Sequence, residues 1–160
     1  KPTPKAIRES SVAALEQLAK RLKVPREVLA SRSLVIGHSL GAAAALMAAE
    51  DLGIHRGILI SPFTSMTDMG RQVLGWPLCY LNLHRFDNRK TLAALCQHAE
   101  TRFTIYHGMS DDLIPIRMST ELAAAHPGQI TLHPSPGGHN DVLLHIQTQL
   151  KAETLKLSGL

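Results

Sequence analysis

A serine between two glycines is the first feature of this sequence that could do chemistry. Residues 34–41 read LVIGHSLG, so Ser39 follows an aliphatic run and precedes an alanine-rich stretch. The pattern G-x-S-x-G at a strand-to-helix turn exposes a serine hydroxyl, and we expect Gly37 and Gly41 to prevent clashes at that turn. The helix that follows would direct its first amides, beginning with that of Leu40, at negative charge developing beside the hydroxyl. The segment therefore predicts a serine nucleophile with the Leu40 amide as an oxyanion donor.

Such a serine requires two partners. Its hydroxyl is a weak nucleophile until a base removes the proton, and the base needs a carboxylate to orient it. In this pattern the acid usually follows the serine along the chain and the histidine comes last. Residues 107–115 read HGMSDDLIP and residues 134–141 read PSPGGHND, which supply Asp111, Asp112 and His139 in that order.

Other side chains could line a substrate pocket. His38 lies inside the turn, and we expect its side chain to point away from Ser39 in a structural or pocket-lining role. The excursion from about residue 62 to residue 99 is too long for a simple crossover and contains Phe63, Trp76 and Leu78. It is interpreted either as two short helices packed on the domain or as a small cap over the pocket.

Composition excludes several classes of protein. The net charge of +4 is scattered and aromatic residues form 4% of the chain, which argues against a nucleic-acid partner. The nine histidines show no HxxxH or HxH spacing with a carboxylate, so no metal site is expected. No organic cofactor is expected either, because water can resolve an acyl-serine intermediate. Cys79 and Cys96 are expected to be buried thiols, which favours a reducing, cytoplasmic location. No apolar run is long enough for a membrane span, and no secretory leader opens the chain.

The elements that must position these residues alternate between strand and helix. This order predicts one α/β domain over residues 1–160, with a mostly parallel sheet of about four strands and flanking helices. Asn140 or Asp141 is expected to cap the last helix. The expected helices are 5–22, 40–52, 118–125 and one through Val142, Leu143, Ile146 and Leu150; the expected strands are 33–37, 57–60, 102–106 and 129–133.

Several motifs together resemble the α/β-hydrolase-fold serine hydrolases, most closely their lipase-like or depalmitoylase-like and serine aminopeptidase-like groups. The motifs are GHSLG at 37–41, SPFTS at 61–65, RFDN at 85–88, HGMSDDLIP at 107–115 and GGHND at 137–141. The resemblance implies Ser39 as nucleophile, His139 as base and Asp111 as acid. Asp112, and Asp68 after the second strand, are the alternative acids.

The resemblance also implies an activity, and it implies that this chain lacks the first strands of the fold. It predicts a serine hydrolase that cleaves an ester, thioester or related acyl bond in a small acyl substrate or an acylated molecule. A serine peptidase of the same fold is one alternative, and a non-catalytic interaction module derived from a hydrolase is the other. Because the family has further strands before the elbow strand, the chain resembles the C-terminal part of an N-terminally truncated fold. We therefore expect strand 33–37 to be an exposed sheet edge through which the chain could self-associate.

Overall fold

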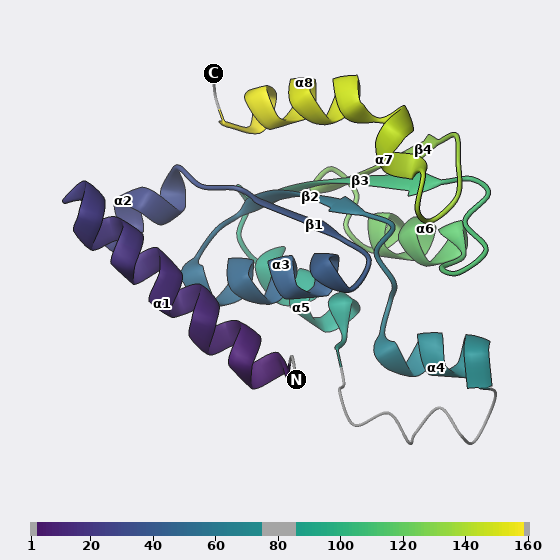
Figure 1. Cartoon of the computed structure of the whole chain (residues 1–160), viewed down its shortest axis with the longest axis horizontal. Helices are drawn as coiled ribbons and strands as arrows, with labels where there is room; N and C mark the ends of the chain where they lie inside the picture. Colours follow the sequence, from purple (N-terminus) through teal and green to yellow (C-terminus); the bar gives the residue numbers. More distant parts are fainter. Residues whose placement is uncertain (1–2, 75–85, 159–160) are drawn as a thin grey trace.

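The computed structural model describes residues 3–74 and 86–158. Strands and helices alternate along most of the chain (Figure 1). The strands are β1 (Val35–His38), β2 (Arg56–Ile60), β3 (Arg102–Gly108) and β4 (Ile130–Ser135). The helices are α1 (Pro4–Leu22), α2 (Arg26–Ser31), α3 (Leu40–Leu52), α4 (Met66–Leu74), α5 (Asn88–Leu95), α6 (Ile116–Ala125), α7 (Val142–His145) and α8 (Gln147–Ser158).

The four strands form one parallel sheet in the order β1-β2-β3-β4. The register places Leu59 between Gly37 and Ile105, and Ile105 beside Leu132. All four strands therefore end at the same edge of the sheet, where the sites of open parallel sheets form. The prediction of an α/β fold with a mostly parallel sheet of about four strands is confirmed.

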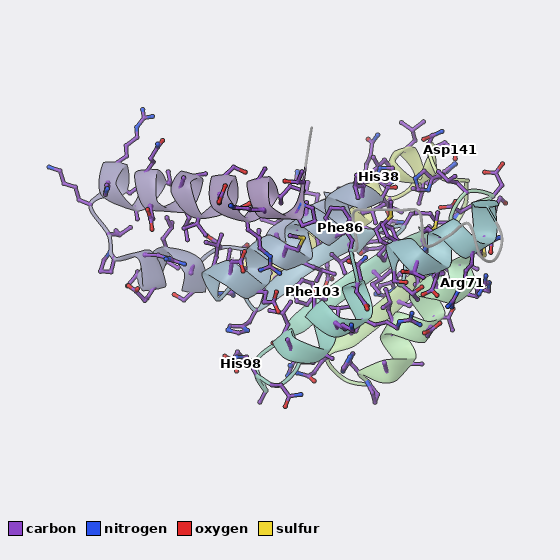
Figure 2. All side chains as sticks on the ribbon, turned by 90° about the horizontal axis from the view of Figure 1, so that it is seen from below. His38, Arg71, Phe86, His98, Phe103 and Asp141 are labelled. Carbon is purple, nitrogen blue, oxygen red and sulfur yellow. The ribbon has the colours of Figure 1, made fainter. Side chains whose placement is uncertain are left out.

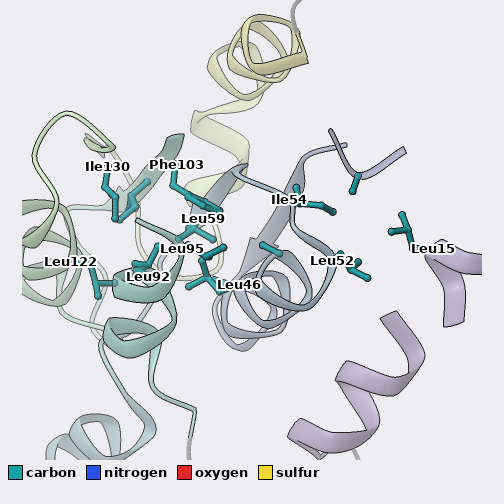
Figure 3. Close-up of a cluster of buried hydrophobic side chains, with 14 residues drawn as sticks. Leu15, Leu46, Leu52, Ile54, Leu59, Leu92, Leu95, Phe103, Leu122 and Ile130 are labelled. Carbon is teal, nitrogen blue, oxygen red and sulfur yellow. The ribbon is translucent and has the colours of Figure 1, made fainter. Parts of the chain in front are cut away.

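Alternating strand residues build a core on each face of the sheet. Leu59 and Ile105 face α3, α5 and α6, where Leu46 of α3 and Leu92 of α5 belong to the same buried cluster (Figure 3). The neighbouring positions Ile58, Ile60 and Tyr106 point to the other face and pack with Val142 and Ile146. Figure 1 shows the same division, with α7 and α8 on the face opposite α3, α5 and α6. Strands that are apolar at consecutive positions are typical of a sheet covered on both faces.

The helix termini follow local sequence signals. Thr3 caps α1 by accepting a hydrogen bond from the Ala6 amide, and Pro4 occupies the first turn, where its missing N–H costs nothing. The left-handed conformation of Gly53, with φ of 69°, ends α3 where the sequence predicts. The connection from the end of α3 at Leu52 to the start of β2 at Arg56 is therefore short.

Two parts of the helical prediction were wrong. The first helix ends at Leu22 as predicted, but no helix was predicted after it, whereas α2 begins at Arg26, since the fixed φ of Pro25 suits a position just before a helix. The single C-terminal helix is two helices, which meet at Ile146. The Asp141 side chain does not cap α7, because its Oδ1 accepts a hydrogen bond from the Gly138 amide instead.

Two segments within the excursion over residues 62–99 pair with each other through their backbones. Ser65 and Asp87 form an antiparallel bridge, and the Met66 amide donates a hydrogen bond to the Phe86 carbonyl. Helices α4 and α5 lie at the two ends, and residues 75–85 between them are outside the described residues.

Two observations bear on the expected environment of the protein. In the described ranges, none of the helices is both long and apolar enough to cross a membrane. Cys96 is a half-buried free thiol whose pKa is raised by burial, and Cys79 lies outside the described residues.

Candidate active site

Ser39 occupies a strained turn between β1 and α3. Its φ of 56° and ψ of −122° are angles that a residue with a side chain rarely adopts, at a cost of about 1–3 kcal/mol. The Ser39 amide donates to the Ile60 carbonyl over 2.9 Å, which holds the turn against the end of β2. The serine is thereby presented at the carboxyl edge of the sheet.

The two glycines of the turn are not equivalent. A Cβ atom on Gly37 would lie 2.2 Å from the Gly41 carbonyl oxygen, so position 37 requires glycine. A Cβ atom on Gly41 would meet nothing within 4 Å, so the expectation that Gly41 also prevents a clash was wrong. The reason is directional: at the start of α3 the side-chain position of residue 41 points away from the turn, whereas that of residue 37 points into it.

Ser39, His139 and Asp111 form a continuous hydrogen-bonded chain. His139 Nε2 lies 3.0 Å from Ser39 Oγ, and His139 Nδ1 lies 2.8 Å from Asp111 Oδ2. The three residues follow β1, β4 and β3 respectively, and the two oxygen partners are 100 and 28 residues from the histidine. In the neutral imidazole that fits this chain, Nδ1–H donates to the carboxylate and Nε2 accepts the serine proton.

Hydrogen-bond donors surround the carboxylate of Asp111. Its Oδ1 accepts bonds from the Leu113 and Ile114 amides over 3.1 and 2.8 Å, while Oδ2 accepts from His139. Burial would raise the pKa of Asp111, but the bonds from Ile114 and His139 outweigh it and hold the pKa below its ordinary value. Asp111 is therefore a fixed anion directed at His139.

His107 also lies against the carboxylate of Asp111. Its ring is fully buried, with Nε2 2.8 Å from the Ile114 carbonyl and 3.3 Å from Asp111 Oδ2. Nδ1 lies 2.6 Å from the Ser119 hydroxyl, which donates to it when Nε2 carries the hydrogen. Burial lowers the pKa of His107, so the ring is a neutral structural group near pH 7.

His38 contacts the candidate base rather than the nucleophile. Its Nε2–H donates to the His139 backbone carbonyl over 3.0 Å, and the two rings lie with centroids 4.9 Å apart. Burial and the neighbouring His139 lower the pKa of His38, so it is neutral near pH 7. The sequence predicted that the His38 side chain points away from Ser39. It did not predict the contact of His38 with the loop that carries His139. Figure 2 shows His38 at the same end of the molecule as Asp141, which follows that loop.

The loops that carry Asp111 and His139 are in close contact through glycine. A Cβ atom on Gly108 would lie 2.5 Å from the Gly137 carbonyl oxygen, and the Ser110 amide donates to that oxygen over 3.0 Å. Asp141 holds the second loop by accepting from the Gly138 amide, and this bond lowers the pKa of Asp141. Sequence reasoning missed this role of Asp141, for which the GGHND motif was the available signal.

Leu40 begins α3 immediately after Ser39. Its amide is therefore one of the N-terminal groups that have no acceptor within the helix, and it lies at the positive end of the helix dipole. That placement agrees with a backbone oxyanion donor beside the serine hydroxyl.

The two alternative acids, Asp112 and Asp68, have other surroundings. Asp112 is exposed, while Asp111 takes the position beside His139. Asp68, in α4, accepts hydrogen bonds from Thr64 and Ser65 and pairs with Arg89.

Of the pocket residues proposed in the 62–99 excursion, only Phe63 lies in the described part of the chain. Phe63 is 2% exposed and packs in a buried cluster with Ala43 and Met118, so its assignment to the pocket wall was wrong. In sequence, an aromatic residue after a strand is compatible with a place in the core or on a pocket wall. The near-complete burial of Phe63 assigns it to the core. Trp76 and Leu78 lie outside the described residues.

Comparison with known proteins extends these observations. No protein-family model matches the sequence. Two curated relatives, both uncharacterized proteins of Mycobacterium tuberculosis strains, are 35% identical over 114 residues, which is 69% of this chain. The chain spans only 39% of the length of those relatives.

Solved structures of similar fold include enzymes of two kinds. An esterase domain of a Rhodothermus marinus protein has a TM-score of 0.65 at 18% identity, covering 93% of this chain and 68% of its own. An acylaminoacyl peptidase of Pyrococcus horikoshii has a TM-score of 0.62 at 13% identity over 89% of this chain and 25% of its own. A Xanthomonas campestris protein described as a candidate hydrolase of the alpha/beta superfamily has a TM-score of 0.56 at 21% identity, with 96% and 69% covered. At these identities the likeness shows a shared fold.

Proposed function

The four-stranded sheet and its helices form part of the α/β-hydrolase fold, and we propose that the chain is a serine hydrolase that cleaves an ester, thioester or related acyl bond. One observation supports this most directly: the hydrogen-bonded chain from Ser39 Oγ through the His139 ring to Asp111, with links of 3.0 and 2.8 Å. These are the lengths and order that a nucleophile, its base and an orienting carboxylate need. An esterase domain and a peptidase among the structures of similar fold support hydrolysis as the reaction class.

In the proposed mechanism the acyl group passes through Ser39. Ser39 Oγ attacks the acyl carbon while His139 Nε2 takes the hydroxyl proton, and the resulting tetrahedral oxyanion lies near the Leu40 amide. His139 then gives the proton to the leaving oxygen, sulfur or nitrogen, which leaves an acyl-Ser39 ester. A water molecule gives its proton to His139 and attacks this ester, releasing the carboxylic acid and restoring the serine.

Asp111 stabilises the imidazolium that forms in both half-reactions. Its pKa is held low, so it remains ionised near neutral pH and offers a full negative charge to His139 Nδ1–H. A buried, hydrogen-bonded anion in this position fixes the tautomer without itself taking the proton.

The first experiment is covalent labelling with a fluorophosphonate, in which Ser39 Oγ would displace fluoride at phosphorus. We expect mass spectrometry to find the adduct on the peptide that contains Ser39, and Ser39→Ala to abolish it. Ser10→Ala, which removes an exposed hydroxyl on α1, is the matched control and should label normally. Asp111→Asn should lower the turnover of a reactive ester by about 10³- to 10⁴-fold.

Substrate class is tested with a second set of probes. A series of p-nitrophenyl esters of rising acyl length, with matched thioesters and peptide anilides, separates esterase and thioesterase activity from peptidase activity. Turnover of the anilides above the esters would identify the chain as a peptidase of the same fold. A folded protein that neither labels nor turns over any of these probes would contradict the proposal and favour a non-catalytic interaction module.

A further inference from the structure

Two histidines and a glutamate meet at the end of the sheet opposite Ser39. His55 directly precedes β2, and His98 and Glu100 lie in the turn between α5 and β3. The Arg102 amide donates to the His55 carbonyl over 2.8 Å, which joins the two segments. Figure 2 shows His98 near the lower edge of the molecule, well apart from His38. The cluster is therefore separate from the candidate active site.

The three side chains already direct their ligand atoms at one point. His55 Nε2 lies 3.8 Å from Glu100 Oε1, and His98 Nδ1 lies 3.9 Å from the same oxygen. The ligand atoms of the three residues all lie within 4.8 Å of one another. Neighbouring ligands of a tetrahedral zinc ion are roughly 3.3 Å apart, given Zn–N and Zn–O bonds of about 2.0–2.1 Å. His98 and Glu100 are exposed, so their side chains can move the roughly 0.5–1.5 Å that would bring the three ligand atoms to this spacing.

Thr101 sets the tautomer of the least exposed of the three ligands. Its buried hydroxyl donates to the Leu95 carbonyl over 2.7 Å, so the same oxygen can only accept from His55 Nδ1–H at 3.3 Å. With the hydrogen on Nδ1, His55 directs the lone pair of Nε2 at the Glu100 carboxylate. The lone pair of His55 Nε2 and the Glu100 carboxylate therefore face the same space, which is the arrangement that a bound metal ion needs. A hydroxyl or carbonyl that fixes the second nitrogen of a histidine is the usual support of a metal ligand.

The backbone of the turn is also held in place. The His98 carbonyl accepts hydrogen bonds from the Thr101 amide over 3.1 Å and from Gln129 Nε2 over 2.8 Å. Its position is therefore fixed from both the turn and the start of β4, so binding a metal requires little ordering of the main chain.

We propose that His55, His98 and Glu100 bind one Zn²⁺ ion, with water as the fourth ligand. Two imidazole nitrogens and a carboxylate form a donor set that zinc accepts and magnesium does not favour. The ion would join the segment before β2 to the turn before β3, and so act on stability rather than at Ser39. Sequence spacing could not reveal this site, because 43 residues separate His55 from His98 and the fold alone brings them together.

The test uses the full chain after dialysis against EDTA and titrates it with Zn²⁺ by calorimetry. We expect one saturable site, no comparable binding of Mg²⁺, and a thermal midpoint that rises with the zinc concentration. His98→Ala and Glu100→Gln should each weaken the binding at least tenfold and remove the zinc-dependent rise. His126→Ala, which removes a histidine outside the cluster, is the matched control and should bind as the unaltered chain does.

The same data can overturn the proposal. Absence of a saturable zinc site, or equal zinc affinity in the His98 and Glu100 variants and the unaltered chain, would exclude this site. Both variants change exposed side chains, so unchanged thermal midpoints without metal would show that folding is not the cause of any loss. Esterase activity is not a readout, so failure of the zinc site and failure of the proposed hydrolase are distinguished.

Discussion

His139 is the side chain on which the proposed chemistry depends, and contacts on three sides fix its position. Asp111 and Ser39 hold the two ring nitrogens, and His38 holds the backbone carbonyl while its ring lies against the imidazole. Since His38 contacts the base through its backbone carbonyl and its ring, we expect it to be a positioning residue. An error of about 1 Å in the position of a base can lower turnover by roughly 100-fold.

Replacing His38 tests this positioning role. We expect His38→Ala to lower kcat at least tenfold with little change in KM, because the base moves while the substrate site is unaltered. His38→Gln, which can still donate to the His139 carbonyl, should recover part of the loss. Steady-state kinetics on one ester measures both effects, with His126→Ala as control. A rise in KM at constant kcat would instead identify His38 as a pocket residue.

The low pKa of Asp111 makes folding stability depend on pH. A carboxyl whose pKa is lower in the folded protein than in the unfolded chain adds stability that is fully present above its ordinary value near pH 4. That stability is lost as the pH falls from about 4 through the lower, folded pKa. Asp111→Asn should therefore destabilise the protein at pH 6 and much less at pH 3. Urea unfolding at both values measures the difference, and an equal destabilisation at the two pH values would contradict the argument.

At the scale of elements, the β1–α3 turn depends on one glycine. Gly37→Ala would place a methyl group 2.2 Å from the Gly41 carbonyl oxygen, so we expect a large loss of stability or no folded protein. Gly41→Ala adds its methyl group to open space inside a helix, where alanine is favoured over glycine by up to about 1 kcal/mol. Thermal unfolding of the two variants compares the same substitution four residues apart. Equal midpoints would show that the turn does not have this geometry.

The contact between the Asp111 and His139 loops gives a second test. A methyl group on Gly108 would meet the Gly137 and Gly138 carbonyl oxygens at 2.5 and 2.9 Å, so Gly108→Ala must separate the two loops. We expect fluorophosphonate labelling of Ser39 to slow at least tenfold, since Asp111 and His139 would part. Gly41→Ala, which adds its methyl group to open space at a position that, like Gly108, has no positive φ, is the matched control. Equal labelling rates in the two variants would contradict this role of Gly108.

Sequence predicted the elements best where one local signal dominates. Residues 40–52 form a helix with the predicted bounds because alanine-rich sequence meets a glycine stop at Gly53. The separation of α7 from α8 was not predictable in this way, because the apolar residues keep helical spacing through Ile146, where the two helices meet. The loss of the expected Asp141 cap was not predictable either, because the Asp141 side chain accepts a hydrogen bond from the Gly138 amide instead. Local sequence shows which residues can cap a helix, whereas the partner that a side chain takes depends on the fold.

At the scale of the whole molecule, the topology explains both what the motifs revealed and what they did not. The motifs after β1, β3 and β4 meet because parallel strands end at one edge of the sheet, and the structure brings Ser39, Asp111 and His139 together there. His55 and His98 meet at the opposite edge, but no local spacing marks residues that precede different strands. Phe63 was assigned to the pocket because sequence alone does not distinguish a buried aromatic residue from an exposed one.

The edge position of β1 leads to a prediction about association. Among the described residues β1 pairs only with β2, so the backbone groups on its other side are open to another strand. Ile36 stands beside Ile58 in the sheet, yet it is 46% exposed whereas Ile58 is fully buried. An exposed apolar edge strand is a template for pairing, and lysine on such a strand is a common way to prevent it. We therefore expect this chain to self-associate through β1, and Ile36→Lys to weaken that association at least tenfold.

Sedimentation velocity over a hundredfold range of protein concentration measures this association. Leu144→Lys is the matched control, because Leu144 is 69% exposed but lies on α7, on the face of the sheet rather than at its edge. If general surface hydrophobicity drove association, both lysine variants would reduce it alike. If backbone pairing at β1 drives it, only Ile36→Lys should shift the sedimentation profile toward monomer. A chain that stays monomeric at every concentration would show that the open edge of β1 is not an association site.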